Sequence, residues 1–242
     1  IRDTKFNLLM NMEKHTALSA DAVVVISQQL KKEIINWGVK EEKISILPNC
    51  VDINDFIPEN VDLKLKNKLN ISTELVLGYI GSIVNYEGLD LLIDTVAELK
   101  KIDDMSLKII IIGEGAEKLR LQNKVNNMGL SNEVIFLGRI EHIEIKKYYS
   151  IIDCIVLPRR SEKVCQIVPS LKPLEAMALE KVVICSDIEP FKDLIENGNN
   201  GFLFEENSKE SLKNLIIDFK KNIKKYKKVG LKSRKWGEKN RN

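Results

Sequence analysis

The chain has 242 residues, of which 44% are apolar, a content typical of a globular protein with a packed core. Its 38 basic and 35 acidic residues nearly cancel to a net charge of +3, which is too small and too evenly spread to indicate a nucleic-acid-binding protein. No apolar run approaches the ~18 residues that a membrane span needs. The chain begins with an isoleucine, and we expect it to be the C-terminal part of a longer protein.

Short apolar runs alternate with amphipathic segments, which predicts strands that are each followed by a helix. The runs predict strands at 22–26, 44–47, 75–80, 107–112, 134–137, 154–157, 182–185 and 201–204. The amphipathic segments predict helices at 28–37, 89–100, 117–128, 143–151, 173–179, 190–197 and from Ser208, the expected N-cap, onward. The polar stretch 50–72 predicts an irregular linker, and 102–104 a turn.

The strands are apolar throughout, so both faces of the sheet must be covered. The alternation with helices therefore predicts an α/β fold with a Rossmann-like parallel sheet and helices on both faces. Ligands of such sheets bind beyond the carboxyl ends of the strands. This rule selects the loops that follow residues 80, 112, 137, 157 and 185 as the candidate site.

The four cysteines form no Cys-x-x-Cys pair and have no histidine at ligand spacing, so we expect no metal site. Cys154 and Cys185 lie within apolar runs, which predicts reduced thiols in the core of a cytoplasmic protein. We expect His15 and His142 to be structural or exposed, since neither has a nucleophilic constellation beside it in the sequence.

The run 168–178 has the composition of a loop that leads into a helix. Pro169 and Pro173 favour an extended approach to the helix. A helix start offers unpaired N–H groups and partial positive charge, and so suits a phosphate. Lys172 adds a full charge there, and Glu175 in the first turn could accept hydrogen bonds from sugar hydroxyls. The alternative is a solvated loop before an ordinary amphipathic helix.

The segment VPSLKPLEAMALEKVVICSD, at 168–187, resembles the donor-binding signature of the family 4 retaining glycosyltransferases, which have the GT-B fold. Members carry two glutamates separated by seven residues. Glu175 matches the second glutamate, whereas the first falls at Ile167, which is not a carboxylate. Further segments resemble the family in order along the chain, at 20–27, 43–52, 81–93, 113–115, 134–139 and 233–236.

The resemblance implies three parts of a C-terminal, donor-binding half. Residues 1–50 would be the tail of the acceptor-side domain and the crossover, 51–225 the nucleotide-sugar donor-binding domain, and 226–242 a helix that returns to the missing N-terminal domain. An isolated half of this kind is not expected to turn over substrate. The lysine-rich stretch 220–228 predicts a solvated helix face, with a membrane-surface contact as the alternative.

The resemblance also implies a function. It predicts a hexosyl-type glycosyltransferase that moves a sugar from a UDP- or GDP-type donor to a sugar or lipid-linked hydroxyl acceptor, with retention of configuration and without a metal or cofactor. The expected role is cell-surface polysaccharide or glycoconjugate synthesis, in the cytoplasm or at the inner face of the membrane. The alternatives are a non-catalytic nucleotide-sugar-binding scaffold and a GT-B epimerase or phosphorylase. A Rossmann dehydrogenase is disfavoured, because Gly113 and Gly115 are followed by no third glycine at the needed place.

Within the site, the resemblance implies a base pocket at the backbone of 138–140 and a ribose contact at Glu175. The family's phosphate-binding Arg and Lys fall at Ser82 and Glu87, and a carboxylate cannot hold a phosphate oxygen. We therefore predict that Arg159, Arg160 and Lys172, with the amides of 171–174, replace them. Glu162 or Ser170 could stand in for the missing first glutamate.

The predicted catalytic residues are Glu175, Lys172 and Arg160. The predicted donor-binding residues are Gly81, Ser82, Gly113, Gly138, Arg139, Ile140, Arg159, Glu162, Ser170, Leu171, Pro173 and Leu174.

Overall fold

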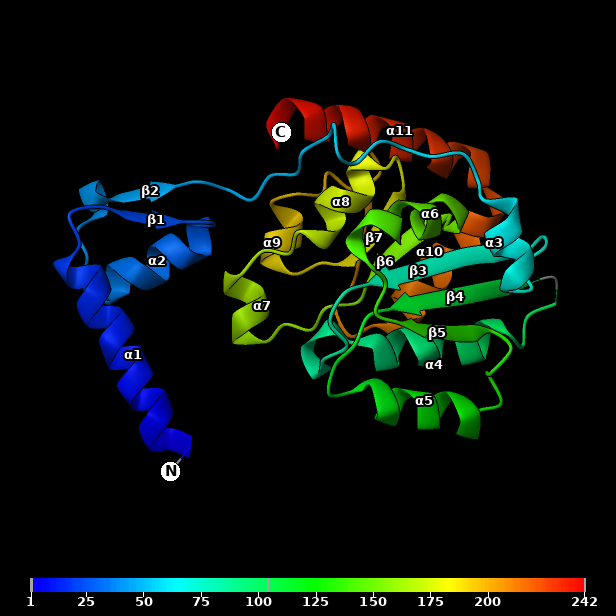
Figure 1. Cartoon of the computed structure of the whole chain (residues 1–242), viewed down its shortest axis with the longest axis horizontal. Helices are drawn as coiled ribbons and strands as arrows, with labels where there is room; N and C mark the ends of the chain where they lie inside the picture. The colour runs from blue at the N-terminus through cyan, green and yellow to red at the C-terminus, as the bar shows by residue number, and fades with distance from the viewer. Residues whose placement is uncertain (1, 104, 242) are drawn as a thin grey trace.

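The computed structural model describes residues 2–103 and 105–241, and shows a β-sheet flanked by helices with a smaller unit beside it (Figure 1). Six parallel strands form the sheet in the order β5-β4-β3-β6-β7-β8. These strands are β3 (Leu75–Ile80), β4 (Leu107–Ile112), β5 (Val134–Gly138), β6 (Cys154–Leu157), β7 (Val182–Ser186) and β8 (Phe202–Phe204). The predicted parallel α/β fold is therefore confirmed.

Helices cover both faces of this sheet. They are α3 (Leu63–Lys68), α4 (Leu89–Leu99), α5 (Lys118–Asn127), α6 (Ile145–Ile151), α7 (Lys163–Ile167), α8 (Lys172–Ala178), α9 (Glu189–Lys192), α10 (Lys209–Lys221) and α11 (Ile223–Asn240). Connections between parallel strands are right-handed, so α4 and α5 lie on one face, and α6 and α8 lie on the other once the chain has crossed back to β6. In agreement, α4 packs against α5 and α10, whereas α8 packs against α11.

The core of the sheet explains why these segments pair. Consecutive residues of the central strands are fully buried, among them Val76 and Leu77 of β3 and Ile109 and Ile110 of β4. Because neighbouring side chains of a strand point to opposite faces, this pattern requires cover on both sides. The carboxyl ends of the strands therefore form one edge at which loops gather.

A smaller unit precedes the sheet. It consists of α1 (Arg2–Ser19), β1 (Val23–Val25), α2 (Gln28–Asn36), the 3₁₀ turn η1 (Glu41–Lys43) and β2 (Ile44–Ile46). The strands β1 and β2 pair in parallel over a separate small apolar core. The Ser27 hydroxyl donates to the Ile167 carbonyl at 2.7 Å, and Lys163 pairs with Glu33 at 2.7 Å, so this unit contacts the sheet domain at α7.

Three segments differ from the sequence prediction. The linker predicted at 50–72 contains α3, whose start is capped by Asp62 and whose Leu65 packs on the core. The short α7 was not predicted. The helix expected at 190–197 is only the four residues of α9. Such short helices are set by tertiary packing and carry too few turns to show a period. The turn predicted at 102–104 includes Asp104, which lies outside the described residues.

Other predictions agree with the structure. The Ser208 hydroxyl accepts a hydrogen bond from the Ser211 N–H and so caps α10. Cys154 and Cys185 are buried free thiols. Among the described residues, no helix is long and apolar enough to cross a membrane.

Candidate functional site

A cavity of about 300 Å³ opens at the carboxyl ends of β3, β4 and β5. It lies where the sheet geometry places ligands in folds of this class. Three loops after strands, the start of α6 and the first turn of α8 all contribute to it. Its lining consists of Phe56, Ile80, Gly81, Ile112, Gly113, Arg139, Ile140, Glu141, His142, Ile145 and Glu175.

The floor of this cavity is bare backbone. The Gly81 N–H donates to the Ile112 carbonyl at 2.9 Å, and the Gly113 N–H donates to the Gly138 carbonyl at 2.8 Å, so the three strand ends are tied together. A Cβ atom at Gly113 would lie 1.9 Å from the Gly81 carbonyl oxygen, and Gly113 has φ of +137°. Only glycine fits there, because the backbone of Gly81 packs directly against Gly113.

Glu175 supplies a carboxylate to the cavity from the first turn of α8. Burial raises the pKa of Glu175, and this effect outweighs the opposing influence of His142, Tyr149 and Lys172. Behind it lies the fully buried Tyr149 of α6, whose pKa is raised well above its usual value by burial and by the Glu175 carboxylate. Glu175 is thus a hydrogen-bond acceptor held at the edge of the protein interior.

A buried cluster of three charges adjoins the cavity. Glu87, at the end of the 3₁₀ turn η2 (Asn85–Glu87), is only 3% exposed. Its Oε1 lies 2.6 Å from Lys172 Nζ and 3.5 Å from Arg159 Nε. The Lys172 side chain lies against Gly81, since a Cβ atom at Gly81 would lie 2.1 Å from Lys172 Cε, but Lys172 itself does not line the cavity. Lys172 therefore brings positive charge to the edge that Gly81 lines.

The two arginines predicted to hold a phosphate lie elsewhere. Arg159 is 6% exposed and is directed inward, with Nη1 donating to the Val168 carbonyl at 2.9 Å. Arg160 Nη2 lies 2.5 Å from Asp90 Oδ2 at the start of α4. Each is engaged by the protein and neither lines the cavity, so the prediction that they replace the missing phosphate ligands finds no support in this arrangement.

Other predicted donor-binding residues also lie outside this cavity. Glu162 is exposed, and its carboxylate accepts a hydrogen bond from Asn85 at 3.3 Å. Ser82 is exposed, and its carbonyl accepts from the Tyr79 hydroxyl. Gly138 does not line the cavity, but its carbonyl fixes Gly113. The stand-in for the first glutamate predicted at Glu162 therefore has no geometric support.

The loop before α8 faces a second cavity. This cavity, of about 370 Å³, lies between the smaller unit and the sheet domain. Ser170 and Leu174 line it with residues of α2 and of the connection after β2, such as Ser27 and Asn49. Leu171 is 46% exposed and Pro173 is buried. Of the predicted donor-binding residues, Ser170 and Leu174 therefore face a different cavity from Gly81, Gly113, Arg139 and Ile140.

Sequence reasoning missed several residues of the site, among them an aromatic pair, a buried tyrosine and a buried glutamate. Phe56 and His142 line the first cavity and contact each other edge to face, with ring centroids 5.7 Å apart. Tyr149 backs Glu175, and Glu87 holds Lys172. The prediction for His142 considered only its sequence neighbours. His142 lies in the loop after β5, one of the loops that the fold rule selects, and this position could have identified it as a site residue.

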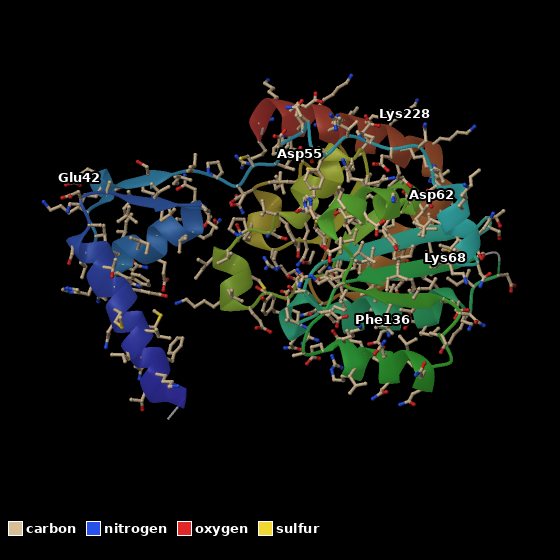
Figure 2. The ribbon with its side chains drawn as sticks, in the orientation of Figure 1. Glu42, Asp55, Asp62, Lys68, Phe136 and Lys228 are labelled. Carbon is tan, nitrogen blue, oxygen red and sulfur yellow. The ribbon has the colours of Figure 1, made fainter. Side chains whose placement is uncertain are left out.

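In the described part of the chain, no group of three His, Cys, Asp or Glu side chains is arranged to bind a metal ion. The polar groups of the first cavity suit a ligand that offers hydroxyls to Glu175 and negative charge to Lys172. Figure 2 shows the side chains in the context of the ribbon, with Asp62 and Phe136 marking the beginning of α3 and the strand β5.

Relatives with this fold are found by sequence and by structure. The chain matches the family "Glycosyl transferases group 1" over residues 61–236 and "Glycosyltransferase Family 4" over residues 2–55. The capsular polysaccharide biosynthesis glycosyltransferase CapM of Staphylococcus aureus is 26% identical over 234 residues, covering 90% of this chain and 58% of CapM. The chain spans about half the length of the curated relatives it matches.

Two solved structures resemble the chain closely in fold. Anabaena HepE in complex with UDP-glucose has a TM-score of 0.83 at 22% identity, covering 96% of this chain and 63% of HepE. The C-terminal domain of a glycosyl transferase group 1 family protein (LpcC) from Francisella tularensis has a TM-score of 0.66 at 25% identity, covering 78% of this chain and 97% of that one. The chain therefore belongs to the group 1 glycosyl transferases, with a parallel sheet of the GT-B type.

Proposed function

We propose that this chain is the donor-binding half of a retaining, metal-independent hexosyltransferase that uses a nucleoside-diphosphate sugar. One observation carries the proposal. At one edge of the sheet, Glu175 and the Lys172 side chain lie close to the loops after β3 and β4, each of which begins with a glycine. The relatives add support, since HepE was crystallised with UDP and with UDP-glucose and CapM is named for capsular polysaccharide biosynthesis.

The cavity divides naturally among the parts of such a donor. The backbone at Arg139 and Ile140 would form the wall beside the base. Glu175 would accept hydrogen bonds from the ribose hydroxyls, an interaction of about 1.5–3 kcal/mol for a charged acceptor. The diphosphate would lie beside Gly81 and Gly113, and Lys172, whose Cε lies against Gly81, would be the cation that meets it.

The chemistry asked of this half is mainly electrostatic. When the sugar–phosphate bond breaks, negative charge develops on the leaving diphosphate, and a cation at a fixed place stabilises it. Lys172 would supply that charge. We further propose that the leaving diphosphate assists the acceptor hydroxyl on the same face of the sugar, which gives retention. The acceptor would be a sugar or a lipid-linked hydroxyl.

A thermal-shift panel tests the proposal. The protein is melted with UDP, GDP, the corresponding nucleosides and a set of nucleotide sugars, each with EDTA and with Mg²⁺. A ligand that binds only the folded state must raise the melting temperature. We expect one nucleoside diphosphate to stabilise the chain equally in EDTA and in Mg²⁺. If no nucleotide raises the melting temperature, the donor-binding proposal fails. A non-catalytic scaffold that still binds nucleotide sugars would be stabilised as a transferase is, so this panel tests donor binding and not turnover.

The half-buried Glu175 gives the site a pH dependence. The carboxylate accepts ribose hydrogen bonds, whereas the protonated acid loses acceptor capacity. Because burial raises the pKa of Glu175 above its usual value of 4.5, we expect nucleoside affinity to fall on acidification with a midpoint above 4.5. Calorimetry with uridine, which has no phosphate to titrate, measures this. The Glu175→Gln variant should bind uridine weakly with no such midpoint, and an unchanged acid limb in that variant would assign it to another group.

The exposed face of α11 suits a negatively charged membrane surface. This 18-residue helix contains seven lysines and Arg234 against Glu238, a net charge of +7, whereas the whole chain has +3. Its opposite face, which includes Tyr226 and Val229, is buried against the domain. Figure 2 shows Lys228 on the outer side of the helix. We include in the proposal a peripheral contact of this face with anionic lipid, at about 1 kcal/mol per lysine.

Vesicle sedimentation tests this contact. We expect the protein to pellet with vesicles that contain phosphatidylglycerol and to stay in the supernatant with phosphatidylcholine alone. Replacing Lys224, Lys228, Lys232 and Lys235 together by glutamate should abolish pelleting without changing nucleotide stabilisation. Equal pelleting of the quadruple variant would show that α11 is an ordinary solvated helix.

A further inference from the structure

The inference concerns the buried carboxylate of Glu87. It stands at the end of the loop after β3, and it is 3% exposed. Its partners are two cations from other parts of the fold, Lys172 at 2.6 Å and Arg159 at 3.5 Å. One acid and two bases leave the cluster with a net charge of +1. An isolated buried charge is strongly unfavourable, so these three groups depend on one another.

Lys172 is the member of this cluster that contacts the cavity wall: it does not itself line the cavity, but its side chain lies against Gly81, which does. Its Cε occupies the place that a side chain at residue 81 would take, and Gly81 lines the cavity. Its Nζ lies 5.2 Å from the centre of the Tyr79 ring. The Lys172 side chain is 18% exposed, so part of it remains accessible. An ammonium group has three N–H donors, so Lys172 can donate to Glu87 and still offer a proton to a ligand.

Burial works against the charged form of Lys172. It lowers the pKa of the Lys172 ammonium, and Glu87 is the strongest influence in the opposite direction. The other groups that face this lysine are Arg159, which lowers its pKa further, and Glu175, which raises it. The phenol of Tyr79, whose pKa is raised well above its usual value by burial and by Glu87, stays neutral. Glu87 is therefore the main acidic partner of Lys172.

We propose that Glu87 is a positioning residue that holds Lys172 against Gly81 in its charged form, so that its ammonium meets the diphosphate of the donor. This proposal rests on the proposed function, because it concerns the phosphate end of the same ligand. The proposal predicts a difference in affinity: ligands that carry a diphosphate bind more tightly because of the Lys172–Glu87 pair, whereas the nucleoside alone does not.

The test compares UDP with uridine as the pH is raised from neutral to alkaline. In the wild type, the ratio of UDP affinity to uridine affinity falls as Lys172 loses its proton. The uracil ring also loses a proton at alkaline pH, but it does so in both ligands, so this effect cancels in the ratio. In Glu87→Gln, which keeps the shape and removes the charge, we expect UDP affinity about tenfold weaker near neutral pH and the alkaline fall displaced to lower pH. Uridine affinity should equal that of the wild type. Lys172→Met should remove the alkaline fall and most of the advantage of UDP over uridine.

Several results would overturn the proposal. Unchanged UDP binding by Glu87→Gln at every pH would show that Glu87 does not act on Lys172. Tighter UDP binding by this variant would mean that Glu87 competes with the diphosphate. If the wild type binds neither UDP nor uridine, the proposed function fails instead, so the two failures are distinguishable. Should Glu87→Gln fail to fold, Glu87→Asp keeps the charge, and the proposal then requires an alkaline limb at the wild-type position.

Discussion

Replacing Glu87 by alanine is expected to lower the free energy of unfolding by about 3–5 kcal/mol, the usual cost of breaking a buried ion pair. The change removes the carboxylate that pairs with Lys172 and with Arg159. Arg159 Nε already has no hydrogen-bond acceptor among the described residues, so it is left further unpaired. Urea denaturation followed by circular dichroism measures the loss. Adding Lys172→Met to Glu87→Ala should recover part of it, since one of the two stranded cations is then gone.

Glu114 provides a matched control for this experiment. Its carboxylate also lies 2.6 Å from a lysine ammonium, that of Lys118, but its side chain is 54% exposed. An exposed ion pair contributes about 0–1 kcal/mol, so Glu114→Ala should change the stability little. Equal effects of Glu87→Ala and Glu114→Ala would show that the buried cluster is not what the distances and the burial indicate.

Replacing Glu175 by alanine is expected to weaken nucleoside-diphosphate binding by about 10–100-fold. The magnitude corresponds to the loss of one hydrogen-bonded charged acceptor, about 1.5–3 kcal/mol. The protein itself should remain folded, because burial disfavours the Glu175 carboxylate and its removal relieves that cost. Calorimetric titration of UDP into the wild type and the variant measures the change.

Glu144→Gln is the control for Glu175→Ala. Glu144 lies in the neighbouring 3₁₀ turn η3 (His142–Glu144), is exposed, and pairs with Lys147 outside the cavity. The Glu144→Gln variant should bind UDP with the affinity of the wild type. If Glu175→Ala also keeps wild-type affinity, the ribose is not held by α8, and the assignment of the cavity to the donor is wrong.

The sheet could be predicted almost residue by residue, because its strands are short apolar runs that the chain separates clearly. The predicted bounds of β3, β4 and β6 are those of the structure. The fold rule then placed the site at the strand ends, and the loops after residues 80, 112 and 137 do line the first cavity. No described residue directly after 157 or 185 lines it, and Glu175 of α8 is the one lining residue that follows β6 in the chain.

The partners within the site could not be read from the sequence. Glu87 and Lys172 are 85 residues apart, and nothing local in either segment shows that they meet. Each was interpreted singly, Glu87 as a lost phosphate ligand and Lys172 as a free cation. Arg160 was likewise interpreted as an unpaired cation, whereas in the fold it forms an ion pair with Asp90. Ion pairing between distant segments therefore changed the interpretation of two of the predicted cations, Lys172 and Arg160, whereas the position of Glu175 on the first turn of α8 was predicted correctly.

The structure of the chain in complex with UDP would test the central claim most directly. We expect the base beside Arg139 and Ile140, the ribose hydroxyls within hydrogen-bond distance of Glu175, and the diphosphate over Gly81 near the Lys172 ammonium. A nucleotide seated instead in the cavity between the smaller unit and the sheet domain, on Ser170 and Leu174 with Glu175 uncontacted, would contradict it.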